Sequence, residues 1–223
     1  MIFSVFIVLI TLGAACAQSQ SGRTTLYWDC CKESCAWPGK ANVSAPVQSC
    51  DISNNPLSNN NVQSGCGTGG AYACANHSPF AVNETLAYGF AAVKLQNSSE
   101  ALWCCQCYEL TFTSSTVRGQ KMIVQATNTG DYSDNNHFDL MVPGGGVGDF
   151  VKGCATQYNA SLTGWGARYG GVSKASECSQ LPPALQAGCR WRFTWFKSAS
   201  IPTVSTLPYL IANHGFMPPT GRL

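Results

Sequence analysis

Apolar and polar residues alternate along several short stretches of the chain, which is the pattern of a β-strand with one buried face. The stretches in which alternation, or a β-branched apolar run, predicts a strand are 86–92, 108–113, 121–127 and 191–195. A short helix is a rival interpretation for the first of them. Helical patterns are brief, at 147–158 and 182–187. Many short strands separated by turns predict a mainly β protein, a barrel or a sandwich, with small helices.

Residues 38–70 are rich in Pro, Gly, Asn and Ser, which favour turns. This segment has too few apolar side chains to form a core of its own. We expect it to lie on the surface as loops that are tied down by Cys50, Cys66 and Cys74.

An apolar run occupies residues 1–17 and ends in Ala15-Cys16-Ala17. This ending has the small-x-small form of a signal-peptidase site, and the run is shorter than the roughly 20 residues that a membrane span requires. We therefore expect a signal peptide at 1–17 and a single secreted domain at 18–223. A mature chain of about 200 residues is long enough to bury a substantial core.

Cysteine is abundant, and removal of Cys16 with the signal peptide leaves 12 of the 13 cysteines, an even number. In an exported protein this indicates disulfides, each of which contributes on the order of 3 kcal/mol. Asn-x-Ser/Thr sequons agree with a secretory route. They begin at Asn42, Asn76, Asn83, Asn97 and Asn159.

Charged residues are scarce, at 11% of the chain, and the formal net charge is +2. Such a chain lacks the strong field that attracts nucleic acid or an anionic membrane. We expect neither as a partner, and we expect a monomer. Low charge combined with many Gly, Asn, Ser, Trp and Tyr residues suits a neutral, hydroxylated partner such as carbohydrate.

The segment 24–35 concentrates several chemical groups and reads Thr-Thr-Leu-Tyr-Trp-Asp-Cys-Cys-Lys-Glu-Ser-Cys. Its aromatic rings offer flat apolar surfaces to a flat polar ligand, and Asp29 would hold a carboxylate at that surface. On these residues alone, the segment could instead be an N-terminal strand fixed by disulfides, with Asp29 as a solvated or capping residue.

A second acidic segment lies far downstream, where an Asn-rich loop leads into residues 136–140 and then into a glycine run. The two-residue period of a strand would point Phe138 and Leu140 to one face and His137 and Asp139 to the other. This arrangement places a carboxylate next to an imidazole, where the backbone can approach a ligand closely.

Other chemistries fit the sequence less well. The glycine run at 144–148 is not followed by the Lys of a phosphate-binding loop. Three His residues without paired spacing argue against a metal site, and a Ser-His-Asp triad lacks the Gly-x-Ser-x-Gly elbow. We expect no metal and no cofactor. Two carboxylates remain as the simplest chemistry, and glycoside hydrolysis needs such a pair.

Four segments resemble those of glycoside hydrolase family 45, the small β-1,4-endoglucanases. They are 24–35, 103–110, 136–148 and 188–193. The resemblance covers roughly residues 22–200. It implies a six-stranded double-psi β-barrel with short helices, long disulfide-tied loops and an open groove. It also implies hydrolysis of internal bonds in cellulose or a related β-glucan, with inversion at the anomeric carbon.

By this resemblance Asp139 is the general acid and Asp29 is the general base that activates water, on opposite walls of one cleft. Apolar neighbours such as Phe138 and nearby negative charge should raise the pKa of Asp139. Asp29 should be the more solvated carboxylate, with the lower pKa. On the loop before the second segment, Asp131 is favoured over Asp134 as a third, assisting carboxylate.

The resemblance also assigns substrate-binding positions. They are Thr25, Tyr27, Lys32, Trp37 and His137. Tyr27 and Trp37 would stack on sugar rings, each contributing on the order of 1 kcal/mol. His137 is also expected to be a hydrogen-bonding neighbour of Asp139, and Trp28 is expected in the core.

The disulfides that the resemblance implies are Cys30–Cys154, Cys31–Cys66, Cys35–Cys104, Cys50–Cys74 and Cys178–Cys189. After about Ser200 the chain departs from the family pattern, so we expect a divergent tail at 201–223. Cys105 and Cys107 are then left without partners, and a missing terminal strand would leave a sheet edge open.

Two kinds of alternative function stay open. A xyloglucanase or glucomannanase would use the same acids in a groove of different shape. A non-catalytic protein, either expansin-like or a carbohydrate-binding or defence protein of the barwin type, would share the barrel. Expansin-like proteins typically lack the base equivalent to Asp29, so Tyr27-Trp28-Asp29 in register favours the enzyme.

Overall fold

The computed structural model describes residues 19–132 and 136–208. The expected signal peptide at 1–17, Asp134 and the last part of the expected tail lie outside these residues. None of the helices within the described ranges has the length and apolar character to cross a lipid bilayer.

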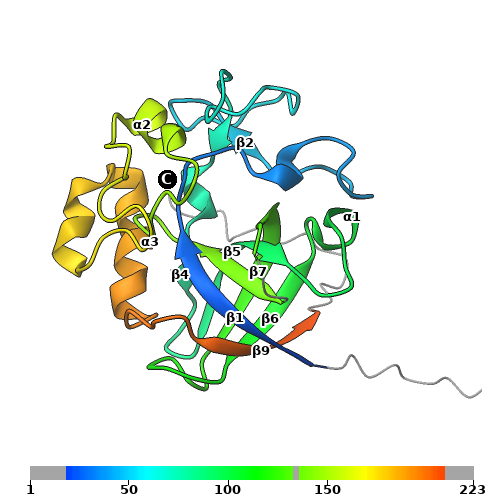
Figure 1. The fold of residues 1–223 in the computed structure, drawn as a ribbon, viewed down its shortest axis with the longest axis vertical. Helices are drawn as coiled ribbons and strands as arrows, with labels where there is room; N and C mark the ends of the chain where they lie inside the picture. Colours follow the sequence, from blue (N-terminus) through cyan, green and yellow to red (C-terminus); the bar gives the residue numbers. More distant parts are fainter. Residues whose placement is uncertain (1–18, 133–135, 209–223) are drawn as a thin grey trace, which may run out of the picture.

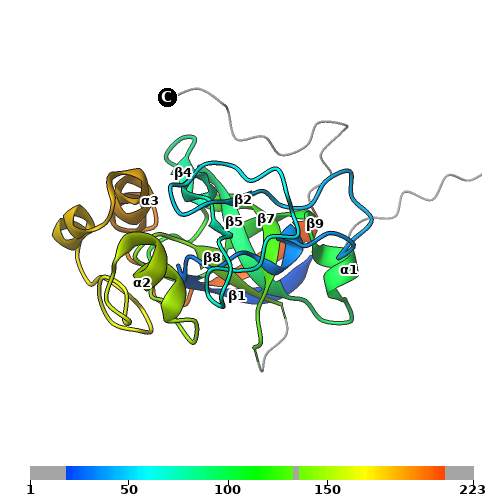
Figure 2. The same ribbon diagram turned by 90° about the horizontal axis from the view of Figure 1, so that it is seen from above.

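Six strands of the described chain close into a barrel (Figures 1 and 2). They are β1 (Gln20–Tyr27), β5 (Leu86–Lys94), β6 (Cys107–Phe112), β7 (Lys121–Thr129), β8 (His137–Met141) and β9 (Thr203–Pro208). The order around the barrel is β5-β7-β6-β9-β1-β8, and β8 pairs with β5 to complete the ring. The pairs β1–β8 and β5–β7 are parallel, whereas the other neighbours are antiparallel. This mixed six-stranded barrel confirms the expected fold class.

Alternating side chains of these strands fill the barrel. Leu110 and Phe112 from β6 pack with Met122 and Val124 from β7, and all four are fully buried. Phe138 joins the same cluster. Thr111, between the two β6 residues, is only partly buried, so alternation predicted β6 correctly. In β7 the intervening Ile123 is buried as well, and this strand was predicted from its β-branched apolar run. The segment 86–92 is a strand, so its helical alternative is wrong.

Short elements surround the barrel. The small strands are β2 (Ser49–Cys50), β3 (Tyr72–Ala73) and β4 (Phe80–Ala81), and the 3-10 helices are η1 (Ser34–Ala36), η2 (Ala75–His77) and η3 (Ala175–Gln180). The α-helices are α1 (Glu100–Trp103), α2 (Lys152–Tyr158) and α3 (Pro183–Thr194). Both views place α2 and α3 together at one side of the barrel (Figures 1 and 2).

The strand predicted at 191–195 is wrong, because these residues end α3 and continue its turn. Trp191 and Trp195 are four residues apart and therefore share one helix face, where their rings stack with centroids 5.3 Å apart. Phe193 lies between them in the sequence, so the three aromatic residues alternate with polar ones as in a strand, although they belong to α3 and the turn that continues it. The helix predicted at 182–187 is real but continues to Thr194, and the one predicted at 147–158 begins at Lys152.

The expected open sheet edge is also wrong. Residues Thr203–Pro208 form β9, which pairs with β1 on one side and β6 on the other. Val204 and Thr206 point inward and are buried, so the segment has the alternation of a barrel strand. The cysteines that are missing from this region are not needed for the strand to form.

Among the described residues, five disulfides link the loops and short elements around the barrel to one another, and their pairing is the one that the resemblance implied. Three of them fix the segment around Asp29. Cys105 and Cys107 are unpaired. The turn-rich segment 38–70 lies at the surface as expected, with β2 as its regular strand. The asparagines of all five sequons are exposed.

Candidate active site

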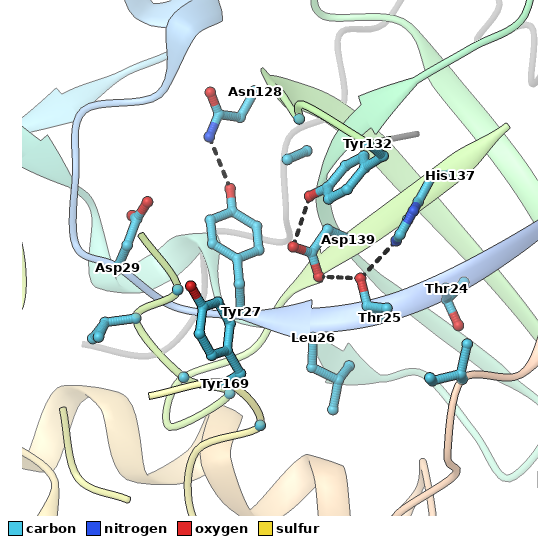
Figure 3. Close-up of a pocket in the computed structure, with 18 of the residues that line it drawn as sticks. Thr24, Thr25, Leu26, Tyr27, Asp29, Asn128, Tyr132, His137, Asp139 and Tyr169 are labelled. Carbon is cyan, nitrogen blue, oxygen red and sulfur yellow. Dashed lines mark hydrogen bonds between the residues drawn. The ribbon is translucent and has the colours of Figure 1, made fainter. Parts of the chain in front are cut away.

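A cavity of about 630 Å³ lies along β1 and β8, and both Asp29 and Asp139 line it. The parallel pairing of these strands places Thr25 opposite Asp139. Asp29 follows the end of β1, on the same side as Thr25 and Tyr27. In the view of Figure 3, Tyr27 stands between the two carboxylates. The two acids, 110 positions apart in the sequence, are thus brought to one cleft by a single strand pair.

Asp139 is held by hydrogen bonds to both of its carboxylate oxygens. The Thr25 hydroxyl donates to Oδ1 at 2.6 Å, and the Tyr132 hydroxyl donates to Oδ2 at 2.7 Å. Burial raises the pKa of Asp139 to about 6, while these two hydrogen bonds oppose the rise. The expected elevation of this pKa is therefore present, with burial as its cause.

His137 contacts the same cluster from β8. Its Nε2 lies 2.7 Å from Oγ1 of Thr25. Because the single hydroxyl proton of Thr25 goes to Asp139, the His137 Nε2–H must be the donor in this contact. The imidazole is 2% exposed, and Tyr132 stacks on it with ring centroids 3.8 Å apart. His137 is thus a hydrogen-bonding neighbour in the cluster around Asp139, linked to it through Thr25.

Asp29 is more buried than the sequence suggested, and the expectation that it would be solvated with the lower pKa is wrong. It is 6% exposed, and its Oδ1 accepts a hydrogen bond from the Cys31 amide at 2.8 Å. Burial, followed by the nearby charges of Glu33 and Asp139, raises the pKa of Asp29 to about 7.

The local backbone explains this burial. Cys30 has a φ of 64°, in the left-handed region, so the chain turns sharply after Asp29. The Cys30–Cys154 disulfide ties this turn to α2. Gly153 packs so closely that a Cβ there would lie 2.3 Å from the Asp29 carbonyl oxygen. Short-range sequence patterns do not reveal this distant covering of Asp29.

A buried contact between Glu33 and His77 lies near Asp29, and sequence reasoning missed it. Glu33 Oε1 is 2.6 Å from His77 Nδ1, and the two side chains are 1% and 7% exposed. The ring of His77 also packs on Phe90 at 4.8 Å. The two residues are 44 positions apart, so no local motif could have paired them.

Lys32 and Trp37 do not line the cavity that contains the two acids. The Lys32 ammonium donates to the carbonyls of Asn60 and Val62, at 2.6 and 2.9 Å, and lies 3.4 Å from the centre of the Trp37 ring. Lys32 therefore anchors a surface loop. Substrate contacts by these two residues stay a prediction.

Asp131 lines the cavity but is fully exposed, and its nearest ionic partner is Lys94 at 3.8 Å. Among the described residues of this loop, the next one, Tyr132, contacts Asp139. Sequence reasoning searched the loop for carboxylates and so passed over the tyrosine.

Exposed aromatic side chains line the same cavity. Phe150 and Tyr169 are 61% and 66% exposed. The Tyr169 hydroxyl donates to Asp149 Oδ1 at 2.6 Å, and Arg168 contacts the same oxygen at 3.1 Å. Tyr27 also lines the cavity, and its hydroxyl accepts a hydrogen bond from Asn128 at 3.1 Å, which fixes the ring. The position of Phe150 two residues after the glycine run was the available sequence signal.

Trp28, unlike these residues, is buried in the core as expected.

Two carboxylates with raised pKa values in an open cleft, flanked by exposed aromatic rings, define the class of site that glycoside hydrolases use. Residues 21–208 match the family model described as glycosyl hydrolase family 45, and the chain belongs to this family. The match continues past Ser200 through β9.

Relatives agree with this assignment. The chain is 57% identical over 190 residues to a putative endoglucanase type K of Fusarium oxysporum, covering 85% of this chain but only 50% of that protein. It is 52% identical over 202 residues to an endoglucanase of Cryptopygus antarcticus, covering 90% and 89% of the two chains. The crystal structure of a cellulase from this Antarctic springtail matches with a TM-score of 0.83 at 51% identity, over 86% of this chain and 91% of that one. The chain thus spans about half the length of the Fusarium relative and most of the springtail one.

Proposed function

We propose that this chain is a secreted endo-β-1,4-glucanase that hydrolyses internal bonds of cellulose or a related β-glucan with inversion. The observation that carries the proposal is the placement of Asp29 and Asp139 on one open cleft. The names of the relatives support the substrate class. The enzyme would act as a monomer without a cofactor, and residues 18–223 would form the secreted protein after cleavage.

In this mechanism Asp139 gives its proton to the glycosidic oxygen of the leaving sugar. Asp29 takes a proton from a water molecule, whose oxygen bonds to the anomeric carbon from the opposite face. The glycosidic bond breaks as the new bond forms, so the configuration inverts. The proton gained by Asp29 must then return to Asp139, through solvent, before the next turnover.

Both acids have raised pKa values, and this bears on the cycle. Burial raises the pKa of Asp29 to about 7 and that of Asp139 to about 6, so both carboxyls titrate close to neutral pH. The reaction needs Asp139 protonated and Asp29 ionised.

The aromatic residues supply the surface for a flat polymer. Tyr27, Phe150 and Tyr169 line the cavity, and stacking on each would contribute on the order of 1 kcal/mol. Tyr27 stands between the two acids in the view of Figure 3. This extended apolar lining suits a chain of sugars better than a single sugar unit.

The roles of the acids are tested with Asp139→Asn and Asp29→Asn. Both variants should lose about 10³-fold or more of the release of reducing ends from carboxymethyl cellulose. An aryl cello-oligosaccharide with an activated leaving group needs no proton from the enzyme, so Asp139→Asn should recover activity on it while Asp29→Asn should not. Glu84→Gln, at an exposed acid away from the cleft, is the matched control.

Wild-type turnover by Asp139→Asn on carboxymethyl cellulose would refute the acid role. Recovery of Asp29→Asn, and not of Asp139→Asn, on the aryl substrate would reverse the two roles. NMR of the first product anomer tests inversion, and a parallel panel with xyloglucan and glucomannan identifies the preferred polymer.

A further inference from the structure

Tyr132 makes two contacts with the cluster around Asp139. Its hydroxyl donates to Oδ2 of Asp139 at 2.7 Å, and its ring stacks on His137 at 3.8 Å with an interplanar angle of 23° (Figure 3). The other carboxylate oxygen, Oδ1, accepts a hydrogen bond from the Thr25 hydroxyl. Both carboxylate oxygens of Asp139 are therefore hydrogen-bonded.

We propose that Tyr132 is a positioning residue for the catalytic acid, holding the Asp139 carboxylate in a fixed plane and stabilising its ionised form until substrate is bound. This inference rests on the proposed role of Asp139 as general acid. Tyr132 would then set the pH range of the enzyme without itself taking part in the transfer of the proton.

The direction of the effect follows from the hydrogen bonds. A hydroxyl that donates to a carboxylate interacts more strongly with the ionised form than with the neutral acid. Burial favours the neutral acid, so Tyr132 and Thr25 counteract burial. Tyr132 stays a donor, because burial and the neighbouring carboxylate raise the pKa of its own hydroxyl far above neutral pH.

Other titratable groups face the same cluster. Asp29 and Tyr27 lie on the β1 side, and His137 reaches Asp139 through Thr25. Lys94 on β5 is the register partner of His137 and lies 3.8 Å from Asp131 on the loop. Within the described part of the chain, only Tyr132 and Thr25 donate hydrogen bonds to the carboxylate of Asp139.

The ring contact makes a clean test possible. Tyr132→Phe removes the hydroxyl but keeps the aromatic surface that packs on His137. The substitution should therefore leave the loop and the imidazole in place while removing one stabilising donor from Asp139. A hydrogen bond to a charged group corresponds to a shift on the order of one pKa unit.

The experiment measures the pKa of Asp139 in the substrate-free protein by ¹³C NMR of labelled aspartate, with its signal assigned by Asp139→Asn. We expect Tyr132→Phe to raise this pKa by about one unit. Tyr158→Phe, at a tyrosine that does not line the cleft, should leave it unchanged. The pH dependence of kcat/KM reports the pKa values of the free enzyme. The side of this pH profile that is set by Asp139 should therefore shift to higher pH by the same amount.

An Asp139 pKa that does not rise in Tyr132→Phe overturns the inference, even if overall activity falls. The proposed function fails in a different way. If Asp139→Asn hydrolyses carboxymethyl cellulose normally, the acid role is lost whatever the NMR titration shows. If Asp139→Asn loses activity but the pKa of Asp139 is unchanged in Tyr132→Phe, only the positioning role of Tyr132 is contradicted.

Discussion

Replacement of His77 by Phe should destabilise the protein strongly, although the residue lies outside the cleft. The substitution keeps a ring against Phe90 but removes the partner of Glu33, whose side chain is 1% exposed. The other carboxylate oxygen, Oε2, has no hydrogen-bond partner among the described residues. The Glu33 carboxyl would then be buried without its partner.

The size of the effect follows from this burial. At a pH where both groups are ionised, removing one partner of this buried pair costs about 3–5 kcal/mol, because the remaining charge is still desolvated. For a domain of this size, each kcal/mol lowers Tm by about 2–4 °C, so the expected loss is roughly 6–20 °C. Glu33→Met combined with His77→Phe removes the charge as well, and should recover most of the loss.

Thermal denaturation with the disulfides intact measures these differences. Lys121→Gln is the matched control, because the Lys121–Glu109 pair has a similar contact distance of 2.7 Å but lies at the surface. This control should change stability by less than about 1 kcal/mol. If His77→Phe cost no more than the control, the pair would not be a buried charge pair that stabilises the fold.

Two further predictions concern titratable groups. The pKa of Asp29 is raised to about 7 in the folded protein, so folding takes up a proton between about pH 4 and pH 7, and wild-type stability should fall as the pH rises through that window. Asp29→Asn removes this loss, so its Tm advantage over wild type should grow from pH 4 to pH 8; a constant difference would contradict the burial of Asp29. Burial also raises the pKa of both free thiols, that of Cys107 to about 12. A thiol reagent at pH 8 should therefore label both slowly in the native protein and rapidly after unfolding, and fast labelling of the native protein would refute this.

Local patterns were sufficient for much of the barrel. The alternation around Phe138 and Leu140 predicted which face of β8 is buried, and it therefore also placed His137 and Asp139 on the other face. Alternation also predicted β5 and β6, whereas β7 was predicted from its β-branched apolar run. The pairing of the cysteines, in contrast, came from resemblance to a family, since spacing alone does not determine which cysteines meet.

Local patterns failed where the same spacing of apolar residues fits both a strand and a helix. Trp191 and Trp195 satisfy both a strand period and a helix face, and only their packing in the folded protein selects the helix. Thr203–Pro208 was not predicted as a strand, because the family resemblance recognised in the sequence ends near Ser200. It becomes β9 because β1 and β6 offer free edges on either side of it.

The amino-acid sequence by itself determined that this protein is a disulfide-linked, mainly β domain with carboxylates at positions 29 and 139. Only the tertiary structure decided how those carboxylates behave. A disulfide and a helix fix the backbone around the buried Asp29, and a tyrosine that follows the suspected third acid holds Asp139. Protonation depends on desolvation and on hydrogen-bond donors from distant segments, and these exist only once the chain has folded.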